Sequence, residues 1–171
     1  MIKLVILDRD GVINIDSDAY VKSPDEWHPI EGSLEAIARL NDAGIKVAVA
    51  TNQSGIARGY FTEQTLRHIH EKMESALMAY GGYIDQIFYC PHGPDDGCGC
   101  RKPRPGLLKQ ALQYFSVLPN EACFVGDSPR DIEAAKSVGT LPVAVGHKKI
   151  ISANIEAYAS LSEFVHHLLG K

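Results

Sequence analysis

The stretch VILDRDGVIN, residues 5–14, runs from apolar residues straight into two carboxylates, Asp8 and Asp10, and then into Gly11. An apolar run that ends in Asp-Gly predicts a β-strand followed by a tight turn. Side chains two residues apart in an extended chain point to the same side. We therefore expect Asp8 and Asp10 to face one common ligand beyond the end of this strand.

Short apolar runs of the same kind recur along the chain, with helix-like segments between them. The segment SLEAIARLNDAG, residues 33–44, ends on a glycine, and further helices are expected to begin near Pro105 and Pro129. This alternation predicts a parallel sheet with crossover helices, and continuous apolar strands predict burial on both faces, hence a doubly wound, three-layer α/β/α sandwich. The expected strands are IKLVIL (2–7), KVAVA (46–50), IDQIFY (84–89), ACFVG (122–126) and PVAV (142–145), and one long helix should bury Leu66, Ile69, Met73, Ala76, Leu77 and Tyr80.

Length and composition limit the classes of function. A chain of 171 residues with 45% apolar residues fits a single domain spanning residues 1–171. The net charge of −4 and the lack of a long basic run disfavour nucleic acid as a partner. No apolar stretch reaches the roughly 18 residues of a membrane span, and the start does not resemble a signal peptide. We therefore expect a cytoplasmic protein without a membrane partner, monomeric by default.

Polar residues follow three of the expected strands. Asp8 and Asp10 follow the first, Thr51, Asn52 and Gln53 the second, and Asp127 the fourth. The carboxyl ends of parallel strands share one edge, where ligands bind in such folds, and Lys102 is close enough in the chain to reach that edge. Carboxylates held close together require a cation, and Mg²⁺ is the natural one. Beside such an ion an aspartate can attack phosphorus and form an aspartyl-phosphate.

The segment CPHGPDDGCGC, residues 90–100, predicts a second metal site. Its three thiolates and one imidazole would form a closed tetrahedral Zn²⁺ site with no open position, so the zinc should be structural and fix the loop that leads into Arg101 and Lys102. The one-residue spacing within each pair is tighter than usual, and a flexible loop with coincidental thiols is the alternative. The expected ligands are Cys90, His92, Cys98 and Cys100.

The stretches DRDGVIN, VATNQSG, RKPRPG and GDSPRD together resemble, in order, the four sequence motifs of the haloacid dehalogenase superfamily of phosphotransferases. The resemblance implies a Rossmann-like core, with Asp8 as nucleophile and Asp10 as general acid/base. It implies that Asp8, the carbonyl of Asp10 and Asp127 bind Mg²⁺. It also implies that Thr51, Lys102 and the backbone of Asn52 hold the phosphoryl group. Asp131 would support Lys102 or the metal; its position three residues after Ser128 is equally typical of a helix capping box.

The gaps between the motifs are too short for a large cap domain, so the site should be open. A chain without a cap domain but with this zinc loop resembles two groups of the superfamily. One group acts on D-glycero-D-manno-heptose 1,7-bisphosphate and the other on histidinol phosphate. TNQSGIARGYFTE, residues 51–63, favours the heptose group, which releases the C7 phosphate on the way to nucleotide-activated heptose for lipopolysaccharide. Gln53, Arg58 and Arg101 are the expected substrate-binding residues, since arginine binds phosphate in bidentate fashion.

Three alternatives remain open: histidinol phosphate as substrate, another small phosphomonoester, or a zinc-binding module without catalysis. Ser128 and His28 receive no role. The C-terminal segment predicts an amphipathic helix with Leu161, Phe164, Val165 and Leu168 on its apolar face and His166 and His167 in solvent.

Overall fold

The computed structural model describes residues 1–146 and 154–170, and its centre is one parallel β-sheet of six strands. The strand order is β3-β2-β1-β4-β5-β6, and every neighbouring pair is parallel. The predicted doubly wound sheet is thereby confirmed. The strands are β1 (Leu4–Leu7), β2 (Lys46–Asn52), β3 (Gln86–Cys90), β4 (Ala122–Gly126), β5 (Leu141–Val145) and β6 (Glu156–Tyr158).

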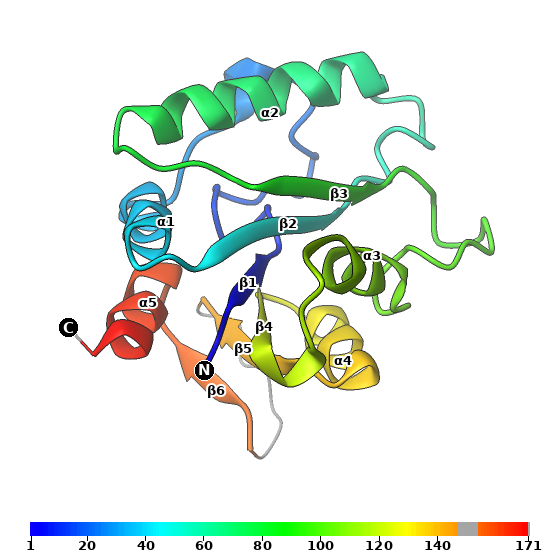
Figure 1. Ribbon diagram of the computed structural model, residues 1–171. Helices are drawn as coiled ribbons and strands as arrows, with labels where there is room; N and C mark the ends of the chain where they lie inside the picture. Colours follow the sequence, from blue (N-terminus) through cyan, green and yellow to red (C-terminus); the bar gives the residue numbers. More distant parts are fainter. Residues whose placement is uncertain (147–153, 171) are drawn as a thin grey trace.

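Helices cover both faces of the sheet, which gives the predicted three layers (Figure 1). Side chains alternate along β1, so Val5 and Leu7 pack with one set of helices while Leu4 and Ile6 pack with the other. One face carries α1 (Ser33–Asp42), α2 (Glu63–Met78) and α5 (Leu161–Leu169), and the other carries α3 (Gly106–Phe115) and α4 (Pro129–Val138). Two short 3₁₀ turns, η1 (Pro24–Glu26) and η2 (Pro119–Glu121), complete the described elements.

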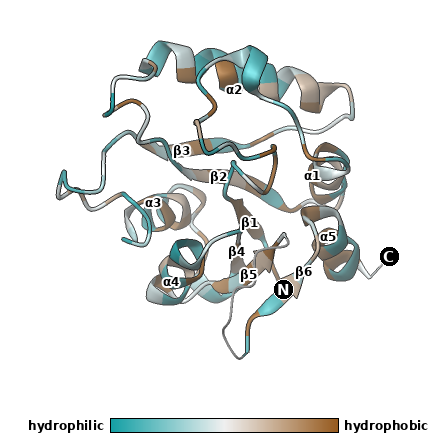
Figure 2. Ribbon diagram, turned by 180° about the vertical axis from the view of Figure 1, so that it is seen from behind, coloured by the Kyte–Doolittle hydropathy of each residue, from teal (hydrophilic) through white to brown (hydrophobic). Residues whose placement is uncertain are grey.

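No cap domain interrupts the sheet, as the motif spacing predicts. In the fully described stretch from Asp10 to Thr51 the chain forms η1, α1 and most of β2, and from Thr51 to Lys102 it forms α2 and β3. No helix within residues 1–146 and 154–170 is long and apolar enough to cross a bilayer. Brown, apolar segments lie along the central strands, whereas β6 and the loop between β3 and α3 include teal, polar segments (Figure 2).

Two details of the sequence-based prediction are wrong. Tyr80 does not belong to the buried face of the long helix, because α2 ends at Met78 and the Tyr80 side chain is 55% exposed. Strand β6 has no counterpart among the predicted strands, because Glu156–Tyr158 is short, lies at the sheet edge and is mostly exposed. The C-terminal helix agrees with its pattern: Leu161, Phe164 and Val165 are buried, while His166 and His167 are exposed.

The position of β1 determines where a ligand can bind. Strands β2 and β3 lie on one side of β1, and β4, β5 and β6 lie on the other, so the order of strand addition reverses between β1 and β4. A crevice beyond the carboxyl ends of the strands forms at such a point in open parallel sheets. Asp8 directly follows β1 and Asp127 directly follows β4. Both predicted carboxylates are thereby brought to the switch point.

Candidate active site

A polar cavity of about 300 Å³ lies at this end of the sheet. It contains residues from all four motifs, together with the loop that follows the first motif. Thr51 is not among the lining residues; it is 1% exposed, and its hydroxyl oxygen accepts a hydrogen bond from Gln53. The lining residues are Asp8, Asp10, Asp16, Ser17, Tyr20, Val21, Asn52, Gln53, Ser54, Arg58, Arg101, Lys102, Asp127, Ser128, Arg130 and Asp131.

Three carboxylates gather on one wall of the cavity. One oxygen of each of Asp8, Asp127 and Asp131 lies within 4.8 Å of the others. Two glycines allow this approach. A Cβ on Gly11, whose φ is +83°, would lie 2.0 Å from Asp127 Oδ2, and a Cβ on Gly126 would lie 2.2 Å from Asp131 Cβ. Any larger residue at either position would displace a carboxylate of the cluster.

Lys102 lies against this cluster and is 2% exposed. Its Nζ is 2.8 Å from Asp131 Oδ1 and 3.0 Å from Asp8 Oδ1. Burial acts to lower the pKa of Lys102, but the charges of Asp131 and Asp8 outweigh it and raise the pKa. The side chain is therefore a fixed ammonium group at the floor of the cavity, suited to a phosphoryl oxygen.

Asp131 has both contacts that the sequence left open as alternatives. Its Oδ1 pairs with Lys102, and its Oδ2 accepts hydrogen bonds from the backbone N–H of Asp127 and of Ser128, each at 3.2 Å. The Ser128 hydroxyl donates to the same Oδ2 at 3.3 Å, in a capping box at the start of α4. Because both oxygens have protein partners, Asp131 holds Lys102 and the Asp127 loop in place.

The first carboxylate, Asp8, is stabilised poorly as an anion by the protein alone. Burial raises the pKa of Asp8 well above its usual value, and the charges of Asp131, Asp10 and Asp127 raise it further, while Lys102 lowers it. Its Oδ1 accepts a hydrogen bond from the N–H of Arg9 at 2.8 Å. A divalent cation between Asp8 and Asp127 would relieve this repulsion, so the donor set fits the hard, oxygen-preferring Mg²⁺.

Asp10 has a different environment, which sequence reasoning did not anticipate. Its Oδ1 is 2.9 Å from Arg9 Nε, 2.9 Å from Arg9 Nη2 and 2.9 Å from Asn14 Nδ2, and Gln53 Nε2 donates to its Oδ2 at 3.3 Å. Burial opposes ionisation of Asp10, but the Arg9 charge and the hydrogen bonds from Asn14, Arg9 and Gln53 together lower its pKa. The two carboxylates of the first motif therefore have opposite pKa shifts: the protein alone raises the pKa of Asp8 and lowers the pKa of Asp10.

Side chains at the end of β2 connect the second and third motifs. Asn52 Nδ2 donates to the Lys102 carbonyl at 3.1 Å, and the Lys102 N–H donates to Asn52 Oδ1 at 3.0 Å. Gln53 Nε2 also donates to Thr51 Oγ1 at 2.9 Å. Asn52 thus fixes the backbone of Lys102, and Gln53 bridges Thr51 to Asp10.

The cavity also has cationic side chains besides Lys102. Arg58, Arg101 and Arg130 all line the cavity, and Arg130 was not predicted although it lies inside the GDSPRD motif. Burial, followed by the charges of Arg130 and Arg58, lowers the pKa of Arg101, which indicates that the three guanidinium groups share one electropositive region. Arg58 lies over the Tyr20 ring with Cζ 5.9 Å from its centroid. These three arginines, here called the arginine rim, suit a second anionic group.

The predicted metal ligands of the loop after β3 also come together. The Cys90, Cys98 and Cys100 thiols and His92 Nδ1 all lie within 4.8 Å of one another. Cys90 Sγ is 3.7 Å from Cys98 Sγ and 2.9 Å from Cys100 Sγ, and His92 Nδ1 is 3.4 Å from Cys90 Sγ and 3.3 Å from Cys100 Sγ. Tetrahedral zinc with bonds of about 2.3 Å to sulfur places its ligand atoms about 3.5–3.8 Å apart. Three of the four distances lie in or near this range, and the Cys90 and Cys100 thiols would have to move apart to bind the metal. The donor set of three thiols and one imidazole fits zinc.

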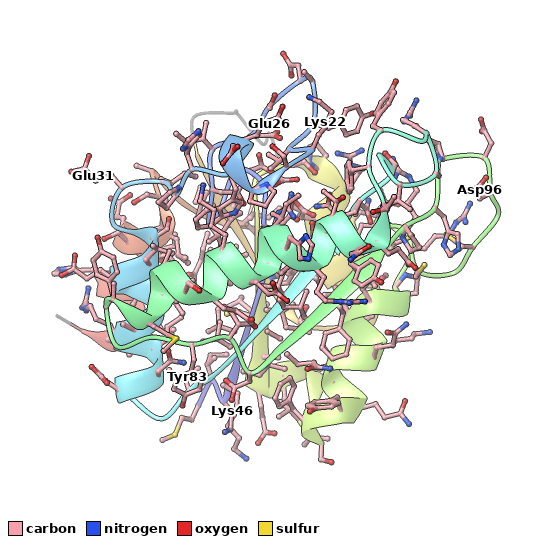
Figure 3. The ribbon with its side chains drawn as sticks, turned by 90° about the horizontal axis from the view of Figure 1, so that it is seen from above. Lys22, Glu26, Glu31, Lys46, Tyr83 and Asp96 are labelled. Atoms are coloured by element: carbon pink, nitrogen blue, oxygen red, sulfur yellow. The ribbon has the colours of Figure 1, made fainter. Side chains whose placement is uncertain are left out.

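The neighbours of this cluster link it to the cavity. Arg101 Nη1 is 3.5 Å from the His92 carbonyl, and Arg104 donates to the Cys98 carbonyl. The Cys90 carbonyl accepts a hydrogen bond from the Gln53 N–H at 2.8 Å. Asp96 accepts from the Gly93 N–H at 2.7 Å and projects from the outer end of the loop (Figure 3), away from the cluster, as expected for a solvated residue.

The sequence matches the haloacid dehalogenase-like hydrolases over residues 7–139. It is 55% identical over 143 residues to the D-glycero-β-D-manno-heptose-1,7-bisphosphate 7-phosphatase of Pseudomonas putida, covering 84% of this chain and 82% of that protein. To the protein of the same name from Bordetella bronchiseptica it is 57% identical over 140 residues, covering 82% and 78%. A crystal structure of D,D-heptose 1,7-bisphosphate phosphatase from B. bronchiseptica, complexed with magnesium and phosphate, superposes with a TM-score of 0.95 at 47% identity over 99% of both chains.

Proposed function

Because the chain belongs to the haloacid dehalogenase-like hydrolase family, we propose that it hydrolyses the C7 phosphate of D-glycero-β-D-manno-heptose 1,7-bisphosphate and releases heptose 1-phosphate. One observation carries this proposal: an acidic wall with a buried lysine and a rim of three arginines face the same cavity. The first suits a phosphoryl group undergoing transfer, and the second suits a phosphate that stays on the sugar. The names of the relatives support the β anomer and favour heptose over histidinol phosphate.

Asp8, Asp127 and the carbonyl of Asp10 would hold Mg²⁺, which when bound neutralises charge on the transferring phosphoryl group. The crystal structure of the B. bronchiseptica relative with magnesium and phosphate supports this cofactor. Asp131 is less suited to direct ligation, since both of its oxygens are engaged by Lys102 and by N–H groups of the Asp127 loop. Its role is to hold Lys102 and Asp127 in place.

Catalysis then proceeds in two steps, with Asp8 as nucleophile and Asp10 as general acid and base. In the first, an Asp8 oxygen attacks phosphorus, the bond from phosphorus to the C7 oxygen breaks, and Asp10 gives that oxygen its proton. In the second, Asp10 takes a proton from water, which attacks the aspartyl-phosphate and releases inorganic phosphate and Asp8. Oδ1 of Asp10 already has three close donor contacts, so Oδ2 carries the proton in both steps.

Arg58, Arg101 and Arg130 bind the C1 phosphate in this proposal, and Gln53 contacts the substrate beside Asp10. Thr51 contacts the phosphoryl group only if Gln53 moves, because Gln53 now covers it. Zinc held by Cys90, His92, Cys98 and Cys100 is structural, because four protein ligands leave no position for substrate. Its thiols must stay reduced to bind the metal, which supports a cytoplasmic location.

The test compares kcat/KM with Mg²⁺ for both anomers of the heptose bisphosphate, histidinol phosphate and simple sugar phosphates. We expect the β bisphosphate to exceed every other substrate by at least about a hundredfold, which corresponds to about 2.7 kcal/mol of transition-state discrimination. A preference for histidinol phosphate would reject the heptose assignment and leave the phosphatase chemistry. No turnover of any substrate by zinc-loaded protein would favour the module without catalysis. The Asp8→Asn variant is the control for contaminating phosphatases.

A further inference from the structure

A buried polar chain extends from the active site into the helical layer on the α2 side of the sheet. Arg9 is 0% exposed, although arginine is rarely buried without a specific partner. Its Nε and Nη2 contact Asp10 Oδ1, and its Nη1 lies 3.2 Å from Nε2 of His70. His70 belongs to α2, lies 61 residues from Arg9 in the chain and is 8% exposed. Neither residue contacts the cavity directly.

The chemistry of the two side chains fixes the direction of this hydrogen bond. Arginine has only donors, so His70 Nε2 accepts and the proton of the neutral ring resides on Nδ1. Burial, together with the nearby Arg9 charge, lowers the pKa of His70 to about 3, in agreement with a neutral ring. The neutral imidazole therefore binds Nη1 of Arg9, while Nε and Nη2 of the same guanidinium group contact Asp10.

We infer that Arg9 and His70 are positioning residues for Asp10: His70 fixes the rotamer of Arg9, and Arg9 holds Oδ1 so that Oδ2 faces the leaving oxygen of the substrate. A guanidinium group on a flexible stem has many orientations, and two anchors at opposite ends of its planar fork select one. Displacement of a proton donor by about 1 Å can cost up to about a hundredfold in rate. The inference rests on the proposed function for one point, the role of Asp10 in giving a proton to the leaving oxygen.

The test separates positioning from simple stability by varying the leaving group. A sugar alkoxide needs a proton to leave, whereas p-nitrophenolate is a far weaker base and leaves without one. The measured quantity is the rate of aspartyl-phosphate formation in a rapid-quench experiment, because the later hydrolysis step uses Asp10 for both substrates. The sugar phosphate is the heptose bisphosphate or, if the wild-type protein does not accept it, the best alkyl phosphate found in the substrate comparison.

We expect His70→Leu to slow phosphoryl transfer from the sugar phosphate about tenfold more than from p-nitrophenyl phosphate. His70→Gln, whose amide oxygen can accept from Arg9, should restore the ratio to within about threefold of the wild type. His68→Leu on the exposed face of the same helix is the matched control and should change neither rate. If His70→Leu does not fold, Arg9→Lys replaces it, since lysine keeps the charge but cannot bind both partners, and the same selective loss is expected.

An equal loss on both substrates, which leaves the ratio of the two rates unchanged, would show that His70 is only structural and would overturn the inference. A His70→Gln variant as impaired as the leucine variant would overturn it too. Failure of the proposed function is distinguishable, because it shows in the wild-type substrate preference. The leaving-group ratio of the variants is measured with whichever alkyl phosphate the wild type hydrolyses.

Discussion

Removal of the Asn52 side chain tests whether the active-site lysine is fixed through its backbone. In the Asn52→Ala variant the Lys102 N–H and carbonyl both lose their partner, at 3.0 and 3.1 Å in the structure. A hydrogen bond contributes about 1 kcal/mol net, and a buried group left without a partner costs about 1–3 kcal/mol. Because Asn52 is only partly buried, water can replace part of the loss. The expected decrease in the free energy of unfolding is therefore about 2–3 kcal/mol.

The effect on catalysis should be smaller than the effect on stability. Lys102 Nζ keeps its two ion pairs, with Asp131 and Asp8, so the ammonium group stays near the phosphoryl site. We expect kcat/KM to fall less than about tenfold in Asn52→Ala. Asn52→Asp should lose more activity, since it still accepts from the Lys102 N–H but sets a negative charge against the Lys102 carbonyl and the incoming phosphate.

Urea denaturation followed by the fluorescence of Trp27, which is 1% exposed, measures the stability of both variants. Asn120→Ala on the exposed turn η2 is the control and should stay within about 0.5 kcal/mol of the wild type. If Asn52→Ala were equally stable, the two hydrogen bonds would not anchor Lys102, and the described link between the second and third motifs would be wrong.

Three further outcomes are expected. Asp8→Asn should abolish phosphate release while its thermal midpoint stays within a few degrees of the wild type; retained turnover would reject Asp8 as nucleophile. Burial lowers the pKa of His70 from 6.5 to about 3, so the unfolded state binds a proton at a higher pH than the folded state does. The free energy of unfolding should therefore fall by about 1.4 kcal/mol per pH unit as the pH drops below 6.5. In parallel urea titrations His70→Gln should lack this loss. In elemental analysis the wild type should contain one equivalent of zinc and Cys98→Ser should contain none; an unchanged zinc content would exclude Cys98 as a ligand. The substitution should raise KM more than it lowers kcat, since Asn52 and Asp131 hold Lys102 independently.

The fold was predictable because its main signal is strong. Four of the predicted strands have uninterrupted apolar cores, and the fifth, at β3, still has three consecutive apolar or aromatic residues, Ile87, Phe88 and Tyr89. Burial of such runs on both faces of a parallel sheet requires helices on each side. The missed strand β6 has the sequence Glu-Ala-Tyr, which has no distinctive pattern, and its pairing with β5 depends on the surrounding tertiary structure. Tyr80 was misplaced because helical periodicity continues past Met78, where the chain turns instead at Gly81 and Gly82.

The site was predictable to the extent that its residues directly follow strands. The carboxyl ends of parallel strands share one edge of the sheet, so the sequence alone predicted that Asp8, Asp10 and Asp127 lie close together. Arg9 was missed for a related reason: alternation directs it away from the ligand side, and a charged residue directed into a core has no partner visible in the sequence. Its partner His70 lies on the buried stripe of α2 among apolar residues, where a histidine gives no local signal. Arg130 could have been predicted, since it lies within GDSPRD, three residues after Asp127, which also lines the cavity.

The numbers of acidic and basic side chains at the floor of the cavity indicate which kind of metal ion the site can hold. Four carboxylates, Asp8, Asp10, Asp127 and Asp131, face two buried cations, Lys102 and Arg9. Arg9 pairs with Asp10, and Lys102 pairs with Asp131 and Asp8, so these four acids exceed these two cations by two charges. A divalent cation cancels that excess and a monovalent one does not, since buried charge must be compensated nearby. In the proposed reaction the charge of a second phosphate requires further cations, and Arg58, Arg101 and Arg130 line the same cavity.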